Sequence, residues 1–303
     1  MTSENKEISI IVTAYNRKEY LNYAINSLPS DDNIDIVLVT NLEEKIISND
    51  FKKISYFYNE GRTYGSMLRE GINESKGNII FFLEDDDEFS PLKVKYVKKV
   101  FKTVKNLSYY HNSYIKIDER GNDLPSQAKT NKYLFGPFSN IKELKRTMNR
   151  DVDHNLSSIV INKQYIDTKE LAALNMINLS VDTYMFAMSV KDGARLFDDN
   201  VFLTKYRIHN STSHPNIDNK LYNPYIRLHK LYSNDYILSS NISQNPYLRD
   251  FLKCRSEVEK LYYSFYLGED RLRNILNSIQ CIKYIDFTTI KNRIEMFINE
   301  FKK

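Results

Sequence analysis

The 303-residue sequence contains no tryptophan, two cysteines, eight glycines and seven prolines. So little glycine and proline excludes collagen-like and loop-dominated folds. The two cysteines, Cys254 and Cys281, cannot form a disulfide framework, no CxxC pair exists for zinc, and a reducing cytosol suits so few thiols. With 42% hydrophobic and 27% charged residues, the chain is globular and long enough for one large domain or two ordinary ones.

Long hydrophobic runs are also missing. The first apolar run, Ile8–Val12, follows a charged segment and is too short for a signal peptide or a membrane span. No later stretch approaches the roughly 18 apolar residues that a spanning helix needs. We therefore expect a cytoplasmic protein that is soluble or, at most, peripheral at the inner face of the cell membrane.

Most of the chain has no excess of charge of either sign. Lysine and arginine total 43, aspartate and glutamate total 39, and the surplus of four falls within residues 221–303. No basic stripe accompanies it, so we expect no nucleic-acid partner. A mildly basic tail is compatible with a peripheral membrane contact, although a solvated helix face is the plainer interpretation.

The first half of the chain alternates between strand and helix patterns. Short, continuous apolar runs are typical of buried parallel strands, and apolar residues at helical spacing follow most of them. The expected strands are residues 8–15, 34–39, 54–58 and 78–83, and the expected helices are 18–28, 64–75 and one beginning near Pro91. This order predicts an α/β fold with an open, Rossmann-like, mostly parallel sheet and helices on its faces.

The rest of the chain is less regular. We expect strands at residues 107–117, 157–161 and 197–208, helices near 163–174 and 183–190, and a loop over 131–140. After Asn219 the apolar spacing becomes helical. These patterns predict an α/β domain over residues 1–215 and a helical C-terminal region over 216–303.

Acidic residues gather where one strand ends. The apolar residues Phe81–Leu83 run directly into four carboxylates, Glu84 to Asp87. Adjacent carboxylates repel one another, and a divalent cation such as Mn²⁺ or Mg²⁺ relieves that cost because it binds carboxylate oxygens. The alternative is a solvated acidic turn that caps the next helix. The buried strand in front favours a metal site at the ligand-binding edge of the sheet.

Three blocks, taken in order, resemble the family 2 glycosyltransferases, which are inverting enzymes with the GT-A fold. The blocks are ISIIVTAYNRKEYLNYAINSL, NEGRTYGSMLREGINESKGNIIFFLEDDDEFSPLKV and SVDTYMFAMSVKDGARLFDDNVFLTKYRIHNSTS. In the second block, LEDDD stands where the family has Leu-Asp-x-Asp-Asp, its DXD motif. The third block ends in the family's Tyr-Arg-x-His pattern. The resemblance covers about residues 8–212.

The resemblance implies a nucleotide-diphosphate sugar as donor and a glycan or a lipid-linked molecule as acceptor. A divalent cation would neutralise the leaving diphosphate, with Asp86 as its main ligand and Glu84 and His209 as the others. Asp182 matches the base that takes the proton from the acceptor hydroxyl. Donor-binding roles are implied for Thr13, Ala14, Tyr15, Arg17, Thr40, Asn41, Arg69, Glu84 and Asp85.

The sequence departs from the family pattern at three places. Glu84 replaces an Asp, the pair Thr40–Asn41 replaces acids that usually read the nucleotide, and Val181 precedes the base where an acid is common. Asp182 would also serve as the N-cap of a helix. Asp153 and His154 lie in a loop that we assign to the acceptor side, with a plain surface loop as the alternative.

Two other functions compete with glycosyl transfer. A nucleotidyltransferase related to the sugar pyrophosphorylases would need a glycine-rich basic loop after the first strand, and residues 13–17 contain no glycine. A non-catalytic relative that binds a nucleotide sugar or a partner protein is compatible with the three departures. The C-terminal helices could serve the acceptor, a membrane surface or a homodimer interface.

Overall fold

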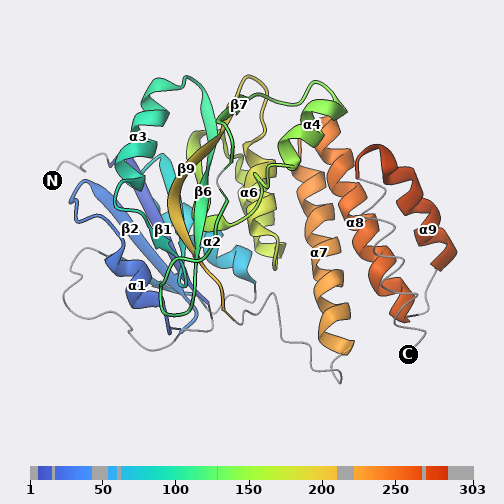
Figure 1. Cartoon of the computed structure of the whole chain (residues 1–303), viewed down its shortest axis with the longest axis horizontal. Coiled ribbons are helices and arrows are strands. Elements are labelled where there is room, and N and C mark those ends of the chain that lie inside the picture. Colours follow the sequence, from blue (N-terminus) through green and yellow to red (C-terminus); the bar gives the residue numbers. More distant parts are fainter. Residues whose placement is uncertain are drawn as a thin grey trace.

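The structure, a computed structural model, describes residues 6–15, 18–42, 54–59, 63–127, 129–209, 222–267 and 271–285. These residues form a sheet with helices on both faces and a row of long helices beside it (Figure 1). The strands are β1 (Ile8–Ala14), β2 (Ile34–Thr40), β3 (Ile54–Tyr58), β4 (Ile79–Glu84), β5 (Glu88–Phe89), β6 (Leu107–Ile117), β7 (Tyr133–Phe135), β8 (Ile159–Asn162) and β9 (Arg195–Arg207). The α-helices are α1 (Leu21–Asn26), α2 (Tyr64–Glu74), α3 (Lys93–Thr103), α4 (Ile141–Met148), α5 (Thr168–Ala173), α6 (Val181–Ser189), α7 (Tyr222–Ile242), α8 (Pro246–Leu267) and α9 (Arg271–Gln280).

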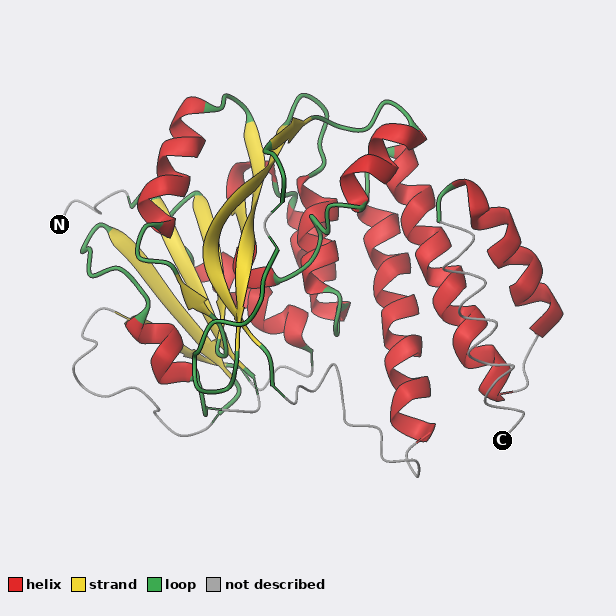
Figure 2. Ribbon diagram, in the orientation of Figure 1, coloured by secondary structure: helices red, strands yellow, loops and turns green. Residues whose placement is uncertain are grey.

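The strands that the described residues contribute form one nine-stranded sheet (Figure 2). Its path runs β3-β2-β1-β4-β8-β6-β9-β5, with β7 paired to β9. The neighbours β3, β2, β1 and β4 are parallel, as the apolar runs predict, whereas β8 lies antiparallel to both β4 and β6. The register pairs Thr13 with Glu84 and Ala14 with Thr40, so the polar residues at these strand ends share one edge.

Each face of the sheet packs against its own hydrophobic core. On one face, apolar side chains of α1 and α3 such as Leu21 and Val97 cover β1, β2 and β4. On the other face, Leu68 of α2 and Tyr184 of α6 pack with alternate residues of β1 and β4, and Met67 of α2 packs with Val37 and Val39 of β2. Burial on both faces explains why these strands are continuously apolar.

The C-terminal helices extend the hydrophobic core on the α2 and α6 face of the sheet. Leu248 and Leu252 of α8 are fully buried within it. Helices α6, α7, α8 and α9 lie side by side in that order, as Figure 1 shows. The helical prediction for the C-terminal region is therefore confirmed over the described part. The predicted domain boundary near residue 215 lies outside the described residues.

The structure corrects two expectations and adds a helix that we did not expect. Residues 131–140, expected to be loop, contain β7, which pairs with β9. Helix α4 follows it, and its N-cap Asn140 accepts a hydrogen bond from the backbone of Glu143, a capping signal that the sequence reading missed. Cys254 and Cys281 are joined in a disulfide, not kept as thiols, because α8 and the short helical turn after α9 hold their Cα atoms 5.3 Å apart.

Candidate active site

A short chain of hydrogen bonds joins the polar residues at the edge of the parallel strands. The hydroxyl groups of Thr13 and Tyr64 lie 2.8 Å apart, and Tyr64 donates to Oε1 of Glu84 over 3.1 Å. Tyr64 is the first residue of α2, and Gly65 lets this end of the helix pack closely against the backbone of residues 174–177. A Cβ at Gly65 would lie 2.0 Å from the carbonyl oxygen of Leu174. This packing holds the Glu84 carboxylate at the sheet edge.

An arginine from β9 clamps the acidic turn that follows β4. Arg207 donates from Nε to the carbonyl oxygen of Asp86 over 2.9 Å. Its backbone N–H donates to Oδ1 of Asp87 over 3.0 Å. Two residues later, His209 places Nε2 at 2.8 Å from Oδ2 of Asp86. The clamp thus brings together two of the three residues that we expected to bind a metal.

The carboxylates of this turn carry poorly compensated charge. Burial, followed by the charges of Asp86 and Asp87, raises the pKa of Glu84 well above its usual range. Burial and the charge of Asp86 also raise the pKa of Asp87. Lys93 is fully buried nearby and donates to Thr204 Oγ1 over 2.8 Å, and its charge offsets part of the repulsion on Asp87. A divalent cation would relieve the remainder.

The donor set at this turn fits a cation shared with a substrate. In the part of the chain that the structure describes, no three His, Cys, Asp or Glu side chains gather as a metal cluster. Asp86 and His209 instead offer one carboxylate and one imidazole. Cations that bind nucleotides are commonly held by one or two protein side chains together with phosphate oxygens and water. The pair therefore fits a cation whose coordination a diphosphate completes.

A cavity of about 660 Å³ lies between this edge of the sheet and the C-terminal helices. Its walls come from the β4 edge, the loop before β8, the start of α6, and helices α7 and α8. The lining includes Tyr64, Glu84, Asp151, Asp153, His154, Asn155, Ser180, Asp182, Tyr206, Leu228, His229, Tyr232, Tyr236, Arg255 and Glu259. Glu84 and Asp182 therefore share one cavity, whereas Asp86 and His209, the other two expected metal ligands, are not among the residues that line it.

Asp182 lies in the first turn of α6, with its side chain partly open to the cavity. Its Oδ1 accepts a hydrogen bond from the backbone N–H of Thr183 over 2.8 Å, while the N-cap of the helix is Ser180. Burial raises the pKa of Asp182 to about 6, against the opposing charge of His154, whose Nδ1 lies 3.9 Å from Oδ2. A carboxylate with this pKa is suited to accept a proton near neutral pH.

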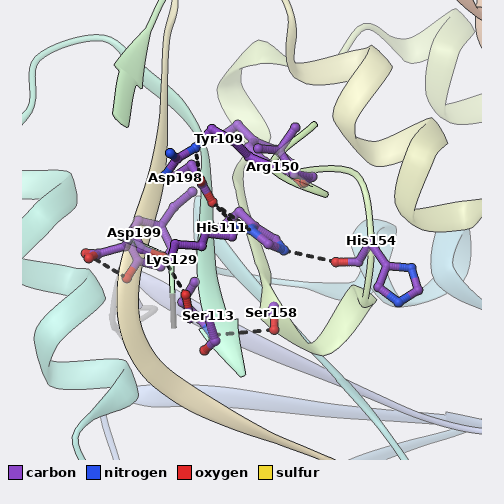
Figure 3. Close-up of polar contacts among 12 residues, drawn as sticks. Tyr109, His111, Ser113, Lys129, Arg150, His154, Ser158, Asp198 and Asp199 are labelled. Atoms are coloured by element: carbon purple, nitrogen blue, oxygen red, sulfur yellow. Dashed lines mark hydrogen bonds and ion pairs between the residues drawn. The ribbon is translucent and has the colours of Figure 1, made fainter. Parts of the chain in front are cut away.

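Asp153 and His154 lie in a loop that two side chains of β6 hold in place. Tyr109 donates its hydroxyl to the carbonyl oxygen of Val152 over 2.6 Å. His111 Nε2 lies 3.0 Å from the carbonyl oxygen of His154 and donates to it, because a carbonyl can only accept (Figure 3). The loop is therefore anchored by its backbone, which leaves the side chains of Asp153 and His154 at the cavity wall.

A buried cluster of charges supports His111 in turn. Asp198, fully buried on β9, lies 2.9 Å from His111 Nδ1 and 2.6 Å from Arg150 Nε, and it also contacts Lys129 (Figure 3). Burial alone would raise the pKa of Asp198, but His111 and Lys129 lower it below its usual value. The cluster thus keeps the Asp198 carboxylate charged inside the protein, and it fixes His111, which in turn holds the loop.

The expected donor-binding residues lie in different environments. Thr40 is fully buried, and its hydroxyl donates to the carbonyl oxygen of Ala14 over 2.8 Å, so this group braces two strand ends. Tyr15 packs its ring against Tyr64, and Asp85 is buried in the acidic turn. Arg69 lines a second hollow, formed largely by α2, and not the main cavity. Asn41 follows β2 and is half-buried, and Arg17 lies outside the described residues.

Several cavity residues had no recognisable signal in the sequence. Tyr64 opens a helix, and nothing in its neighbourhood shows that its hydroxyl reaches Glu84. Tyr232 and Arg255 read as ordinary residues of amphipathic helices. Arg255 in fact pairs with Asp153, and its guanidinium lies 4.6 Å from the ring of Tyr236. Only the packing of α7 and α8 against the sheet domain reveals these roles.

Known proteins share this fold and sequence pattern. A family model described as glycosyl transferase family 2 matches residues 9–167. A protein of Rickettsia conorii described as an uncharacterized glycosyltransferase is 32% identical over 126 residues, which are 39% of this chain and 21% of that protein. One of Rickettsia felis is 26% identical over 221 residues, 70% of this chain and 36% of that protein. The chain belongs to glycosyl transferase family 2.

Solved structures agree with this assignment at the level of the fold. The structure of S. aureus TarS residues 1–349 has a TM-score of 0.57 and 12% identity, and the match covers 96% of this chain and 83% of that one. The same protein in complex with UDP-GlcNAc gives a TM-score of 0.54 over 91% of this chain and 79% of that one. The fold is therefore the GT-A fold that the sequence predicts. The chain spans about a fifth to a third of the length of the first curated relatives that it matches.

Proposed function

We propose that this chain is an inverting glycosyltransferase that moves a sugar from a nucleotide-diphosphate sugar to an acceptor hydroxyl. The observation that carries the proposal is the shared cavity, in which Glu84 of the acidic motif and Asp182 line the same walls. The complex of S. aureus TarS with UDP-GlcNAc supports a nucleotide sugar as the donor, because that protein has the same fold.

Asp182 is the proposed general base. Its carboxylate takes the proton of the acceptor hydroxyl while the acceptor oxygen bonds to the anomeric carbon and the bond from that carbon to the diphosphate oxygen breaks. The nucleoside diphosphate leaves with the electron pair of that bond. One base is sufficient because the second carboxylate of a glycosidase has no counterpart in this chemistry.

Asp86 and His209 would hold a divalent cation, Mn²⁺ or Mg²⁺, at the acidic turn. A cation bound there supplies positive charge for the diphosphate leaving group. The 2.8 Å approach of the two side chains supports this role, as does the repulsion among the neighbouring carboxylates. Glu84 takes part through its carboxylate at the cavity, where Tyr64 orients it.

The donor nucleotide is bound, in this proposal, by Thr13, Ala14, Tyr15, Arg17, Thr40, Asn41, Glu84 and Asp85, and not by Arg69, which lines a different hollow. The Thr40 hydroxyl donates its hydrogen bond to the carbonyl oxygen of Ala14, so these two residues contribute through their backbone at the ends of β1 and β2. The backbone at these strand ends and the ring of Tyr15 then form the surface on which the nucleotide lies.

A catalytically inactive relative that binds a nucleotide sugar is the alternative. It is favoured by Val181 before the base and by Glu84 in place of an aspartate. Incubation of the full chain with a panel of nucleotide sugars and Mn²⁺ separates the two functions. Release of a nucleoside diphosphate supports the enzyme, and tight donor binding without any release supports the inactive relative.

We also propose a peripheral contact with an anionic membrane through α9, where a lipid-linked acceptor would be presented. None of the helices within the described ranges combines the length and the hydropathy of a transmembrane segment. Helix α9 and the turn after it instead carry exposed apolar side chains at helical spacing, namely Leu272, Leu276, Ile279 and Ile282. The basic surplus of the C-terminal region suits an anionic surface. A homodimer interface on this stripe is the competing occupant.

A further inference from the structure

The cavity contains buried polar groups that the fold itself does not use. Asn155 is 4% exposed and lines the cavity, yet neither Oδ1 nor Nδ2 of its amide meets a hydrogen-bond partner among the described residues. Ser180 is 3% exposed and also lines the cavity, and its hydroxyl likewise meets no hydrogen-bond partner among the described residues. Buried polar groups of folded proteins almost always have partners, so these point to a ligand.

The backbone around Asn155 is also held in an uncommon conformation. Asn155 has a φ of 63° and Asp151 a φ of 51°, both in the left-handed region that side chains seldom adopt. The anchors from Tyr109 and His111 to the backbone of this loop keep it there. Strain that the surrounding structure enforces is typical of binding and catalytic sites. Here it places Asn155 among the residues that line the cavity.

The C-terminal region contributes aromatic side chains to the cavity wall. Tyr232 and Tyr236 of α7 both line the cavity, and their rings stack with centroids 6.2 Å apart and an interplanar angle of 24°. The proposed base Asp182 lines the same cavity, and its charge adds to burial in raising the pKa of Tyr232. An aromatic ring beside hydrogen-bonding groups suits a ligand with both apolar and hydroxyl surfaces.

Acidic side chains outnumber basic ones in the cavity wall. Glu84, Asp151, Asp153 and Asp182 line it, as does Glu259, which contacts His229. Arg255 is the one permanently charged cation in the described lining, and it already pairs with Asp153. A phosphate or carboxylate group on the acceptor would face like charges at short range, which disfavours binding.

We propose that Asn155 and Ser180 hydrogen-bond the hydroxyl groups of an uncharged sugar acceptor whose ring lies against Tyr232. This assignment rests on the proposed function, since it makes the cavity the acceptor site of the transfer. It also names the substrate class: a neutral glycan terminus, and not a phosphorylated or acidic one.

The test measures binding of acceptor analogues to the full chain. Uncharged methyl glycosides and the corresponding sugar 6-phosphates are compared at equal concentration by saturation-transfer-difference NMR. The variants are Asn155→Asp, which exchanges the amide for a carboxylate, and Asn155→Gly, which removes it and tolerates the positive φ. Asn106→Gly is the matched control, because Asn106 has a φ of 58° and is exposed away from the cavity lining.

We expect at least one uncharged methyl glycoside to bind and its 6-phosphate to bind less well. Both Asn155 variants should weaken that binding about five- to tenfold, as the loss of one buried hydrogen bond implies, while Asn106→Gly leaves it unchanged. Equal or tighter binding of the phosphorylated sugars, undiminished binding by both Asn155 variants, or no binding of any uncharged glycoside overturns the proposal. Nucleoside diphosphate release by the unaltered chain, measured in parallel, reports separately on the proposed function.

Discussion

Asp182 combines two features that a general base needs. It lines the cavity that Glu84 also lines, and burial raises its pKa to about 6. Because the base must be deprotonated, kcat/KM should fall about tenfold for each pH unit below 6 and level off above it. A pH profile of nucleoside diphosphate release in the presence of acceptor measures this. A profile that is flat from pH 5 to 8 would remove Asp182 from the role.

The variant Asp182→Asn tests the same residue without a change of shape. We expect turnover to fall about 10²- to 10⁴-fold, the typical contribution of a general base, with the low-pH limb lost. The melting temperature should stay close to that of the unaltered chain, because the structure shows Ser180, not Asp182, at the N-cap of α6. An early-melting variant would indicate that the Asp182 contact with the backbone of Thr183 is mainly structural.

Some residues could be found from the sequence and others could not. The acidic motif was recognisable because a buried strand runs straight into adjacent acids, and His209 because it ends a Tyr-Arg-x-His pattern. Asn155 was not, since an unpaired amide exists only once the fold has buried it. The brace between Thr40 and Ala14 was equally invisible, because it depends on strand register.

At the scale of elements, the start of α2 controls the geometry of the site. Gly65 donates its backbone N–H to the carbonyl oxygen of Ile177 over 3.1 Å, and there is no room for a side chain beside that contact. Gly65→Ala should therefore destabilise the protein by about 1–3 kcal/mol, a typical cost of overpacking. It should also displace Tyr64 from Glu84 and lower turnover. Urea unfolding measures the first effect.

Gly136→Ala is the matched control for that substitution. A Cβ at Gly136 would come no closer than 3.8 Å to the carbonyl oxygen of Ala194, so its free energy of unfolding should change little. If both alanine variants unfold at the same urea concentration as the unaltered chain, α2 is not held against the 174–177 segment as closely as the structure indicates.

Elements with one dominant period were predicted well. The apolar runs of β1, β2, β3 and β4 identify parallel strands, and their bounds agree with the structure to within about one residue, although β3, at the edge of the sheet, is half-buried and not buried. Strand β7 was not predicted, because its three residues, Tyr133–Phe135, lie beside glycine and proline and pair with β9, which is distant in sequence. Short strands defined by a remote partner leave no local period to detect.

At the scale of the whole molecule, the C-terminal helices do more than cover the sheet. Helices α7 and α8 complete the cavity, while α9 presents its exposed apolar stripe on the outside of the row. Helical periodicity predicted the helices, but their packing against the α6 side of the sheet could not be read from periodicity. Composition likewise gave no sign of the disulfide between Cys254 and Cys281.

The stripe on α9 predicts weak binding to anionic vesicles. Leu272 and Leu276 are 79% and 61% exposed. The double variant Leu272→Ser, Leu276→Ser should float less with anionic vesicles than the unaltered chain, and Gln280→Ser, an exposed polar position on the same helix, should not. Basic residues near the surface add about 1 kcal/mol each at best, so binding should weaken at high salt. Negligible flotation of all three proteins would contradict the membrane contact and favour the alternative, a homodimer interface on this stripe.

The central claim is that the acidic turn binds a divalent cation for sugar transfer, and the most direct measurement of it uses the donor that the nucleotide-sugar panel identifies. Nucleoside diphosphate release is followed with Mn²⁺ or with EDTA, for the unaltered chain, for Asp86→Ala and for Asp192→Ala, an exposed control position. We predict that EDTA abolishes release, that Asp86→Ala loses most of it even with Mn²⁺, and that Asp192→Ala behaves like the unaltered chain. Full release by Asp86→Ala in the presence of EDTA would contradict the claim.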